Sequence, residues 1–409
     1  MSFVNMRVFG AVLVLAGCAI ADDWPQWRGP NRDGISTEQG LLATWPENGP
    51  AMLWQVDLPG DAYASPAVAG NSVFVTGSIG GKPDRTGFLC ALDPKTGAVR
   101  WQTSYGPEWG SSYESARTTP TVVKDRIYII SGMGRVACME TKAGKLVWQV
   151  DLMERFKGRN IGWGIAESPL VYDNKIICHP GGPDAAVAAL DAGSGATIWQ
   201  SKGLSDKSAY CSPALLNVDG RKQLVTQTEN SVVGLDPESG AVLWKYAHRN
   251  KYAVHPNTPL VFDGNKVFVA SGYNYGAEAL AIKGAAVDPL WRCQQAECHF
   301  QGFMLVGSRI FCPGGGSINC LNTQTGTVVY RVKEVKKPQV TMTASGLIAY
   351  DENGRVWLLD MQADSYTVKG SLKVDFGSGQ HWSTPAVANG AMYLRHGKTL
   401  AAYNLRATH

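Results

Sequence analysis

Short apolar runs, separated by Gly, Asn, Asp and Pro, fill the chain beyond its N-terminal segment. The stretch Ala91–Trp101, ALDPKTGAVRW, shows the pattern most clearly. An apolar strand end is followed by Asp93 and Pro94, which open a tight turn, and by Gly97, which tolerates a positive φ. A return strand then runs to Trp101. This order of residues predicts a β-hairpin that carries an aromatic anchor, which is a structural unit and not a site.

The hairpin unit repeats along the chain. Close copies stand at Cys138–Trp148, Ala189–Trp199, Gly234–Trp244 and Cys320–Tyr330, and a degraded copy at Ala281–Trp291. A second marker, Ser or Thr followed by Pro and an apolar run, opens most repeats, at Ser65, Thr119, Ser168, Ser212, Thr258 and Thr384. Proline fits the first position of a strand, where its missing N–H is not needed. A recurring unit of this kind predicts a repetitive β architecture.

Two further repeats open without the marker, near Gln301 and Met342, which brings the openings to eight. The last repeat, Pro385–Leu405, supplies three apolar strands and ends before a fourth. Trp54 has the surroundings of an anchor tryptophan but no hairpin in front of it. We therefore expect the strand around Trp54 to complete the last unit and close a ring, which leaves no exposed sheet edge.

The eleven-residue pattern resembles the tryptophan-docking repeat of the PQQ-like β-propellers, where PQQ is pyrroloquinoline quinone. That superfamily contains quinoprotein alcohol dehydrogenases and BamB-type assembly factors. The resemblance covers nearly all of the chain and implies an all-β, eight-bladed propeller of four-stranded antiparallel blades, closed by the N-terminal strand. It implies a strap at residues 22–50, laid across the barrel, and a single propeller at residues 51–409. The residues expected to dock on neighbouring blades are Trp54, Trp101, Trp148, Trp199, Trp244, Trp291 and Tyr330.

The first residues predict export. Arg7 is followed by a short apolar run and then by Ala19-Ile20-Ala21, the pattern of a secretory leader at residues 1–21 that is too short to span a bilayer. Leu15–Cys18 also resembles a bacterial lipobox, which would end the leader at residue 17 and leave Cys18 lipidated. Cleavage after Ala21 is favoured, because only a short tether separates Cys18 from Trp24. Either way the chain works outside the cytoplasm, in the periplasm or at the periplasmic face of the outer membrane.

Charge and cysteine content narrow the range of functions that the sequence allows. Lys and Arg number 38 against 34 Asp and Glu, and no basic run stands out, so nucleic acid is not an expected partner. Most cysteines beyond the leader fall in expected strands, where a thiol acts as a small hydrophobe. Cys293 with Cys298 is the best candidate for a disulfide in an exported chain. No zinc-type ligand spacing, phosphate loop or hydrolase elbow is present.

Four antiparallel strands per blade return the chain to the rim where it started. The connections between strands therefore fall into two groups, one on each rim of the propeller. One rim carries tight turns, and the other carries the long links, on which binding residues concentrate. Residues just before each opening strand should ring the central channel at this long-loop rim. Those expected to bind a ligand there are Tyr113, Glu114, Arg117, Trp163, Glu167, Tyr210, His255, Asn257, His299, Gln301, His381 and Trp382.

Two interpretations of this ring remain. In one, aromatic side chains stack on a planar group, Arg117 holds an anion, and Glu114 or Glu167 with Asn257 supply oxygens for Ca²⁺. The resemblance implies that a quinoprotein would place PQQ beside calcium in such a funnel. In the other, polar residues simply face water. The adjacent cysteines of the quinoprotein alcohol dehydrogenases are absent, and only Asp61 is an aspartate in the ring, so no catalytic residue is assigned.

The first hypothesis is therefore a monomeric binding or scaffolding module of the cell envelope, BamB-like in architecture, that takes an envelope protein or a small polar ligand on its long-loop rim. It would touch the membrane only through a lipid anchor, and no cofactor is assigned to it. The alternative is a PQQ- and calcium-dependent quinoprotein dehydrogenase that oxidises an alcohol or a sugar. A third hypothesis, a carbohydrate-binding module, rests on Tyr113, Trp163 and Trp382.

Overall fold

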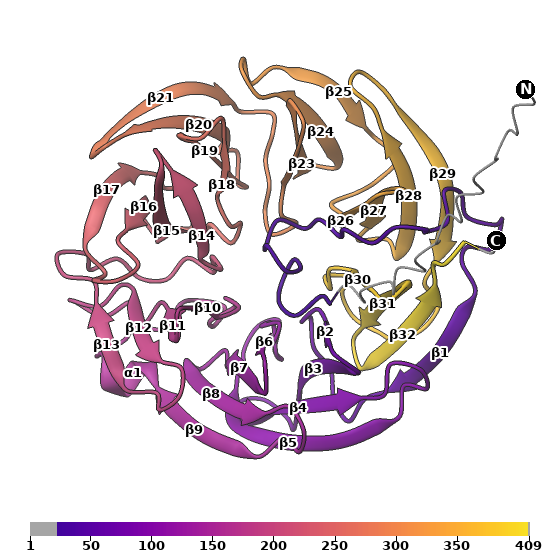
Figure 1. Ribbon diagram of the computed structural model, residues 1–409, viewed down its shortest axis with the longest axis horizontal. Helices are drawn as coiled ribbons and strands as arrows, with labels where there is room; N and C mark the ends of the chain where they lie inside the picture. The colour runs from indigo at the N-terminus through magenta and orange to yellow at the C-terminus, as the bar shows by residue number, and fades with distance from the viewer. Residues whose placement is uncertain (1–22, 408–409) are drawn as a thin grey trace, which may run out of the picture.

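The computed structural model of the chain describes residues 23–407. They form 32 strands arranged in eight four-stranded antiparallel sheets around one axis (Figure 1). The structure confirms the expected all-β, eight-bladed propeller. The leader and Cys18 lie outside the described residues. In the described part of the chain, the structure contains no helix with the length and apolarity needed to cross a membrane.

The first four blades follow in chain order. Blade 1 is β2 (Ala67–Ala69), β3 (Ser72–Ile79), β4 (Arg85–Leu92) and β5 (Val99–Glu108); blade 2 is β6 (Thr121–Val123), β7 (Arg126–Ile130), β8 (Arg135–Glu140) and β9 (Leu146–Asp151), followed by helix α1 (Leu152–Arg155); blade 3 is β10 (Leu170–Tyr172), β11 (Lys175–Cys178), β12 (Ala188–Asp191) and β13 (Thr197–Gln200); blade 4 is β14 (Ala214–Val218), β15 (Arg221–Gln227), β16 (Ser231–Leu235) and β17 (Val242–Ala247).

The remaining four blades complete the ring. Blade 5 is β18 (Leu260–Phe262), β19 (Lys266–Ser271), β20 (Gly276–Lys283) and β21 (Ala286–Cys293); blade 6 is β22 (Met304–Val306), β23 (Arg309–Gly314), β24 (Ser317–Asn322) and β25 (Val328–Val332); blade 7 is β26 (Gln339–Thr343), β27 (Gly346–Tyr350), β28 (Arg355–Met361) and β29 (Tyr366–Lys373); blade 8 is β30 (Ala386–Ala388), β31 (Ala391–His396), β32 (Thr399–Asn404) and the N-terminal strand β1 (Met52–Asp57).

The N-terminal strand closes the ring as the sequence predicts. β1 pairs antiparallel with β32, and Trp54 lies opposite Ala402. The indole Nε1 of Trp54 donates to the backbone oxygen of Pro94 at 2.8 Å, in the hairpin turn of blade 1. Gly97 of the same turn lies under the ring, so close that a Cβ atom there would sit 2.7 Å from the indole. One strand therefore completes blade 8 and also docks on blade 1.

The same docking recurs around the ring. The indole Nε1 of Trp101, Trp148, Trp199 and Trp291 donates to a backbone oxygen in the next blade, at 2.9 to 3.1 Å, and the Tyr330 hydroxyl does so at 2.9 Å. Trp244 differs, because its Nε1 donates to Gln223 Oε1 in its own blade at 2.6 Å. The hairpin of blade 5 also differs, because its strand pairing continues from Ala279 opposite Trp291 to Lys283 opposite Ala286, where the hairpin of blade 1 has already turned.

The Ser/Thr-Pro marker has a second role that the sequence pattern did not reveal. The backbone N–H of Thr119 donates to the Ser168 hydroxyl, and the N–H of Ser168 donates to the Ser212 hydroxyl, both at 2.9 Å. The N–H of Thr384 likewise donates to the Ser65 hydroxyl at 2.8 Å. These bonds join neighbouring blades close to the axis, where backbone groups would otherwise be buried without partners.

The strap, here residues 24–35, crosses the centre of the ring, as the indigo segment of Figure 1 shows. Trp24 pairs with Val68 of blade 1, and Ile35 pairs with Met342 of blade 7. Between them, Arg32 donates to the backbone oxygens of Ser168 and Pro169 at 2.7 and 3.0 Å. The strap thereby bonds to inner strands on opposite sides of the axis, and it separates the long-loop end of the channel from the short-turn end.

Candidate functional site

A cavity of about 430 Å³ lies at the long-loop end of the channel, and we call it the funnel. Its wall is mostly aromatic, with one cationic residue and a few small polar side chains. Trp27 of the strap also contributes to this wall. The aromatic and cationic members are Trp27, Tyr63, Tyr113, Arg117, Trp163, Tyr210, Tyr273, His299, Phe300 and Trp382, and the polar members are Ser65, Thr119, Ser212, Gln339 and Thr384.

Three of the tyrosines are held in an unusual backbone conformation. Tyr113, Tyr210 and Tyr273 have φ angles of 49°, 70° and 62°. These values lie in the left-handed region, where bulky L-residues are rarely found because the Cβ atom crowds the backbone. Such strain persists only where the surrounding structure imposes it, and it concentrates at functional sites. Two links between blades, which carry Tyr113 and Tyr210, and the loop between β19 and β20, which carries Tyr273, are therefore shaped so that each presents a tyrosine to the funnel.

The aromatic rings of the funnel are tilted against one another. Trp382 contacts Tyr63, Tyr113 and Phe300 with ring centroids 5.0 to 5.2 Å apart and interplanar angles of 44° to 65°. Trp163 contacts Tyr210 at 5.9 Å and 42°. Tilted pairs of this kind are favourable arrangements of aromatic quadrupoles. They give the wall the shape of a cup rather than two parallel plates.

Arg117 is the charged group of this wall. Its guanidinium donates to the backbone oxygens of Trp163 and Tyr113, which fixes the two links that carry these rings. Burial lowers the pKa of Arg117 from its ordinary value of 12.5, and neighbouring Glu108 offsets part of this effect. No salt bridge to Arg117 is formed among residues 23–407. A partly buried cation therefore faces the funnel without a counterion from the described chain.

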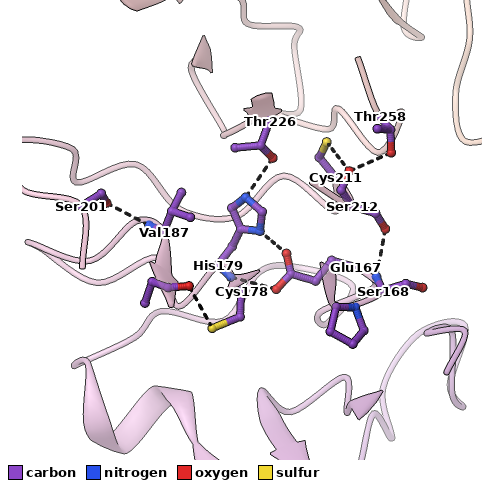
Figure 2. Close-up of polar contacts among 12 residues, drawn as sticks. Glu167, Ser168, Cys178, His179, Val187, Ser201, Cys211, Ser212, Thr226 and Thr258 are labelled. Carbon is purple, nitrogen blue, oxygen red and sulfur yellow. Dashed lines mark hydrogen bonds and ion pairs between the residues drawn. The ribbon is translucent and has the colours of Figure 1, made fainter. Parts of the chain in front are cut away.

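Half of the residues predicted to ring the channel line the funnel: Tyr113, Arg117, Trp163, Tyr210, His299 and Trp382. The other six do not. Glu114, at the outer edge, forms an ion pair with Lys82 at 3.0 Å. Glu167 is fully buried and bonds to His179 through the backbone N–H at 2.8 Å and through the ring Nδ1 (Figure 2). The His179 Nε2 then reaches the Thr226 hydroxyl at 2.9 Å.

The two amides among the six hold a loop. Asn257 donates from Nδ2 to the backbone oxygen of Cys298 at 2.9 Å and accepts the N–H of Gly302 at 3.0 Å. Gln301 accepts the N–H groups of His299 and Phe300 at 2.9 and 3.1 Å. Both amides are buried. They therefore shape the link that carries His299 and Phe300 into the funnel wall.

The last two of the six are histidines. His255 lies within 2.6 Å of the Ser271 hydroxyl, and burial, followed by neighbouring His248, lowers its pKa from 6.5 to about 2. His381 stacks on His396 with ring centroids 3.8 Å apart, and burial, followed by His396, lowers its pKa to about 4. Both rings are therefore neutral at pH 7.

The oxygen donors proposed for calcium do not share a site in the structure. Glu114 is paired with Lys82, Glu167 with His179, and Asn257 with the backbone of another link. The residues described as lining the funnel include no carboxylate. Calcium takes six to eight oxygens, with carboxylates prominent among them. The donor set of the funnel therefore does not fit a hard cation.

The sequence pattern does not predict several residues of the funnel wall. Trp27 belongs to the strap, Tyr273 stands in the loop between β19 and β20, and Phe300 follows the predicted His299. Thr119 enters the pattern only as a strand marker, and Gln339 stands outside it. The Ser/Thr-Pro marker could have pointed to Thr119, because it fixes where each strand meets the channel. Cys293 and Cys298, expected as a disulfide, are free thiols in the structure.

Fold and funnel together define a class: closed eight-bladed propellers with docking tryptophans and a ligand-sized cavity at the long-loop end. A sequence profile described as "Outer membrane protein assembly factor BamB" matches residues 34–108 and 85–312. The chain therefore belongs to this family of PQQ-like repeat propellers.

The chain is similar to outer membrane protein assembly factor BamB of Shewanella oneidensis, with 22% identity over 64% of this chain and 68% of the relative. For BamB of Yersinia pestis the identity is 26% over 54% of this chain, which spans about half (52%) of that relative. The quinoprotein alcohol dehydrogenase PedH of Pseudomonas putida is 28% identical over 35% of this chain and 24% of the relative. Neither group of relatives is favoured decisively by identity.

Two solved structures show the same fold. BamB from Moraxella catarrhalis superposes with a TM-score of 0.61 at 15% identity, covering 88% of this chain and 98% of that one. The quinohemoprotein alcohol dehydrogenase from Comamonas testosteroni gives a TM-score of 0.70 at 13% identity, covering 95% and 81%. At such identities the likeness concerns the architecture alone.

Proposed function

We propose that the protein is an exported, monomeric binding module that acts at the periplasmic face of the cell envelope and recognises an envelope protein through its long-loop rim. The observation that carries the proposal is the chemistry of the funnel. Its wall offers aromatic surface, one cation and one imidazole, His299, and none of the described lining residues is a carboxylate. Such a lining suits recognition, and His299, whose Nε2 lies 3.6 Å from Glu297 Oε2 outside the lining, is its one candidate general base. The BamB family and the predicted leader support the location.

The rigidity of the rim supports a scaffolding role. Docking tryptophans, hydrogen bonds between blades near the axis and the closing strand join neighbouring blades at several points of the ring. Loops above such a frame present their side chains with little loss of conformational entropy on binding. Tyr252 is 51% exposed on the link between blades 4 and 5, and Tyr113 is 49% exposed on the link between blades 1 and 2. Exposed aromatic residues of this kind are typical anchors of protein interfaces.

Crosslinking in the native envelope tests this proposal. A photoreactive phenylalanine at Tyr252, on the long-loop rim, is compared with the same residue at Lys95, in an exposed turn on the opposite rim. We expect a discrete adduct with an envelope protein from position 252 and none from position 95. Adducts of equal yield from both positions, or from neither, would contradict recognition through the long-loop rim.

The alternative function, a quinoprotein dehydrogenase, is favoured by the relative PedH and by the aromatic wall with Arg117, which could receive a flat, acidic cofactor. PQQ would supply a two-electron acceptor. The lining offers no carboxylate to hold calcium beside it or to act as base, so the residues present do not fit the complete group. Titration with PQQ and Ca²⁺, followed by tryptophan fluorescence and by dye reduction with a panel of alcohols, decides the matter. Turnover would overturn the binding-module proposal.

A further inference from the structure

Two buried polar groups in the funnel wall have no hydrogen-bond partner among the described residues. They are the hydroxyl Oγ1 of Thr119, at the start of blade 2, and the amide Nε2 of Gln339, at the start of blade 7. Thr119 has 0% of its surface exposed, and Gln339 has 2%. A buried polar group left without a partner costs about 1–3 kcal/mol, so native proteins rarely keep one. Two such groups in one cavity indicate a ligand that satisfies them.

The other polar side chains of the wall add donors rather than acceptors. The Ser65 and Ser212 hydroxyls accept backbone N–H groups of neighbouring blades, which leaves each hydroxyl proton free for a ligand. The Thr384 hydroxyl donates to Gln339 Oε1 at 3.0 Å, so the amide oxygen is occupied and its NH₂ is the free end. We call Ser65, Thr119, Ser212 and Gln339 the polar ring and leave out Thr384, because its one hydroxyl proton is already donated to Gln339. Its complement is a ligand rich in acceptor oxygens.

Charge and shape restrict that ligand further. Arg117 faces the funnel without a counterion, and no carboxylate lines the cavity to oppose it, so a negative group is favoured. The rings that contact Trp382 are tilted against it by 44° to 65°, so this group of rings presents angled rather than parallel faces. A cup of aromatic faces instead suits the bulkier C–H faces of a saturated ring. About 430 Å³ holds a small molecule and not a folded domain.

We propose that the funnel binds a short acidic saccharide of the uronic-acid type. Its ring faces pack on the tilted aromatic side chains, and its oxygens accept hydrogen bonds from the polar ring, with the carboxylate drawn towards Arg117. This inference rests on the proposed function, because it assigns a ligand to the long-loop rim that we propose as a binding surface. It is separate from the envelope partner, which the exposed loops would contact.

Isothermal titration and tryptophan fluorescence on the full chain test the ligand class. The probes are a tetrasaccharide of linked glucuronates and, as the matched neutral control, cellotetraose. We expect saturable binding of the acidic probe and at least about tenfold weaker binding of the neutral one, since a hydrogen bond to a charged group contributes more than one to a neutral group. Equal affinity for both probes, or no binding of the acidic one, overturns the proposal.

Thr119→Val separates a ligand-binding role from a structural one. The substitution is nearly isosteric and removes a hydroxyl that has no partner in the described chain, so the unliganded protein should be no less stable than the wild type. The affinity for the acidic tetrasaccharide should fall about tenfold. Gln339→Met should weaken binding similarly. Thr367→Val, an exposed position on β29, is the matched control and should change neither quantity.

The outcomes distinguish this inference from the proposed function. If Thr119→Val unfolds the protein or lowers its melting temperature without changing the saccharide affinity, the hydroxyl is structural and the inference falls. If no saccharide binds but the photoreactive residue at position 252 still captures an envelope protein, the inference falls and the proposed function stands. If PQQ binds and alcohols are oxidised, both fall together.

Discussion

Closure of the ring by the N-terminal strand can be tested with a single methyl group. Gly97 has φ +73°, and a Cβ atom there would lie 2.6 Å from Val56 Cγ1 and 2.7 Å from the Trp54 ring. Gly70 has φ +56°, and a Cβ atom there would meet nothing within 4 Å. Alanine at either position pays roughly 1 kcal/mol for the left-handed backbone. Only Gly97→Ala adds an overpacking cost, about 1–3 kcal/mol, at the contact between blades 8 and 1.

The assay compares thermal unfolding of the two variants with hydrogen exchange of β1. An unfolding entropy of about 2.1 cal/mol/K per residue converts the extra cost into a melting temperature about 1–4 °C lower for Gly97→Ala than for Gly70→Ala. The amides of Met52–Asp57 should exchange faster in Gly97→Ala alone, because β1 holds its edge position partly through Trp54. Identical melting temperatures and identical exchange in β1 would refute docking of the closing strand on blade 1.

Three further predictions concern buried polar groups. Glu167→Ala should lower stability by about 2–6 kcal/mol in urea unfolding, because it leaves the buried backbone N–H and ring Nδ1 of His179 without their partner, at about 1–3 kcal/mol each. His299→Ala should change the stability by less than about 1 kcal/mol. His255 stays neutral when folded but takes up a proton below about pH 6.5 when unfolded, so this residue alone should lower stability by about 2 kcal/mol from pH 7 to 5, beside a separate contribution from His381. His255→Asn should reduce the slope by that amount, and an unchanged slope contradicts this protonation state. Alkylation followed by mass spectrometry should label half-buried Cys293 before the buried cysteines. Burial raises the pKa of a thiol such as Cys211, to about 12, and so suppresses the reactive thiolate. Early labelling of Cys211 would contradict its burial.

The blade framework was predictable because it is local. The hairpin turn, its glycine and the returning tryptophan stand within eleven residues of one another, so the sequence pattern contains the whole unit. The role of Trp54 followed from counting strands, because the last repeat lacks one. Trp244 was predicted as a docking residue like the others, but its indole bonds within its own blade. The neighbouring hairpin in blade 5 also has a different register, and it is the one whose repeat is degraded in the sequence.

The site was only half predictable because the repeat register fixes a residue's rim and blade but not the direction of its side chain. Trp163 and Glu167 stand in the same link, yet Trp163 lines the funnel and Glu167 turns inward to His179, whose partner Thr226 comes from blade 4. Such contacts join segments far apart in the sequence. Trp27 was missed for a related reason, since only the path of the strap across the axis brings it to the funnel.

The polar residues that were predicted as ligands share a different task. Asn257 and Gln301 fix the backbone beside His299 and Phe300, and Arg117 bonds to the carbonyls of two aromatic residues of the wall. These polar residues therefore hold the backbone that carries aromatic residues of the funnel wall, including Tyr113 in its strained conformation. Thr119 and Gln339 differ from these supporting residues because their unpartnered groups belong to the wall of the cavity, whereas Gln301 and His255, each of which also has a buried nitrogen without a partner, do not line it. Leaving buried polar groups unpaired is costly, so a cavity wall that carries two of them is organised for a ligand.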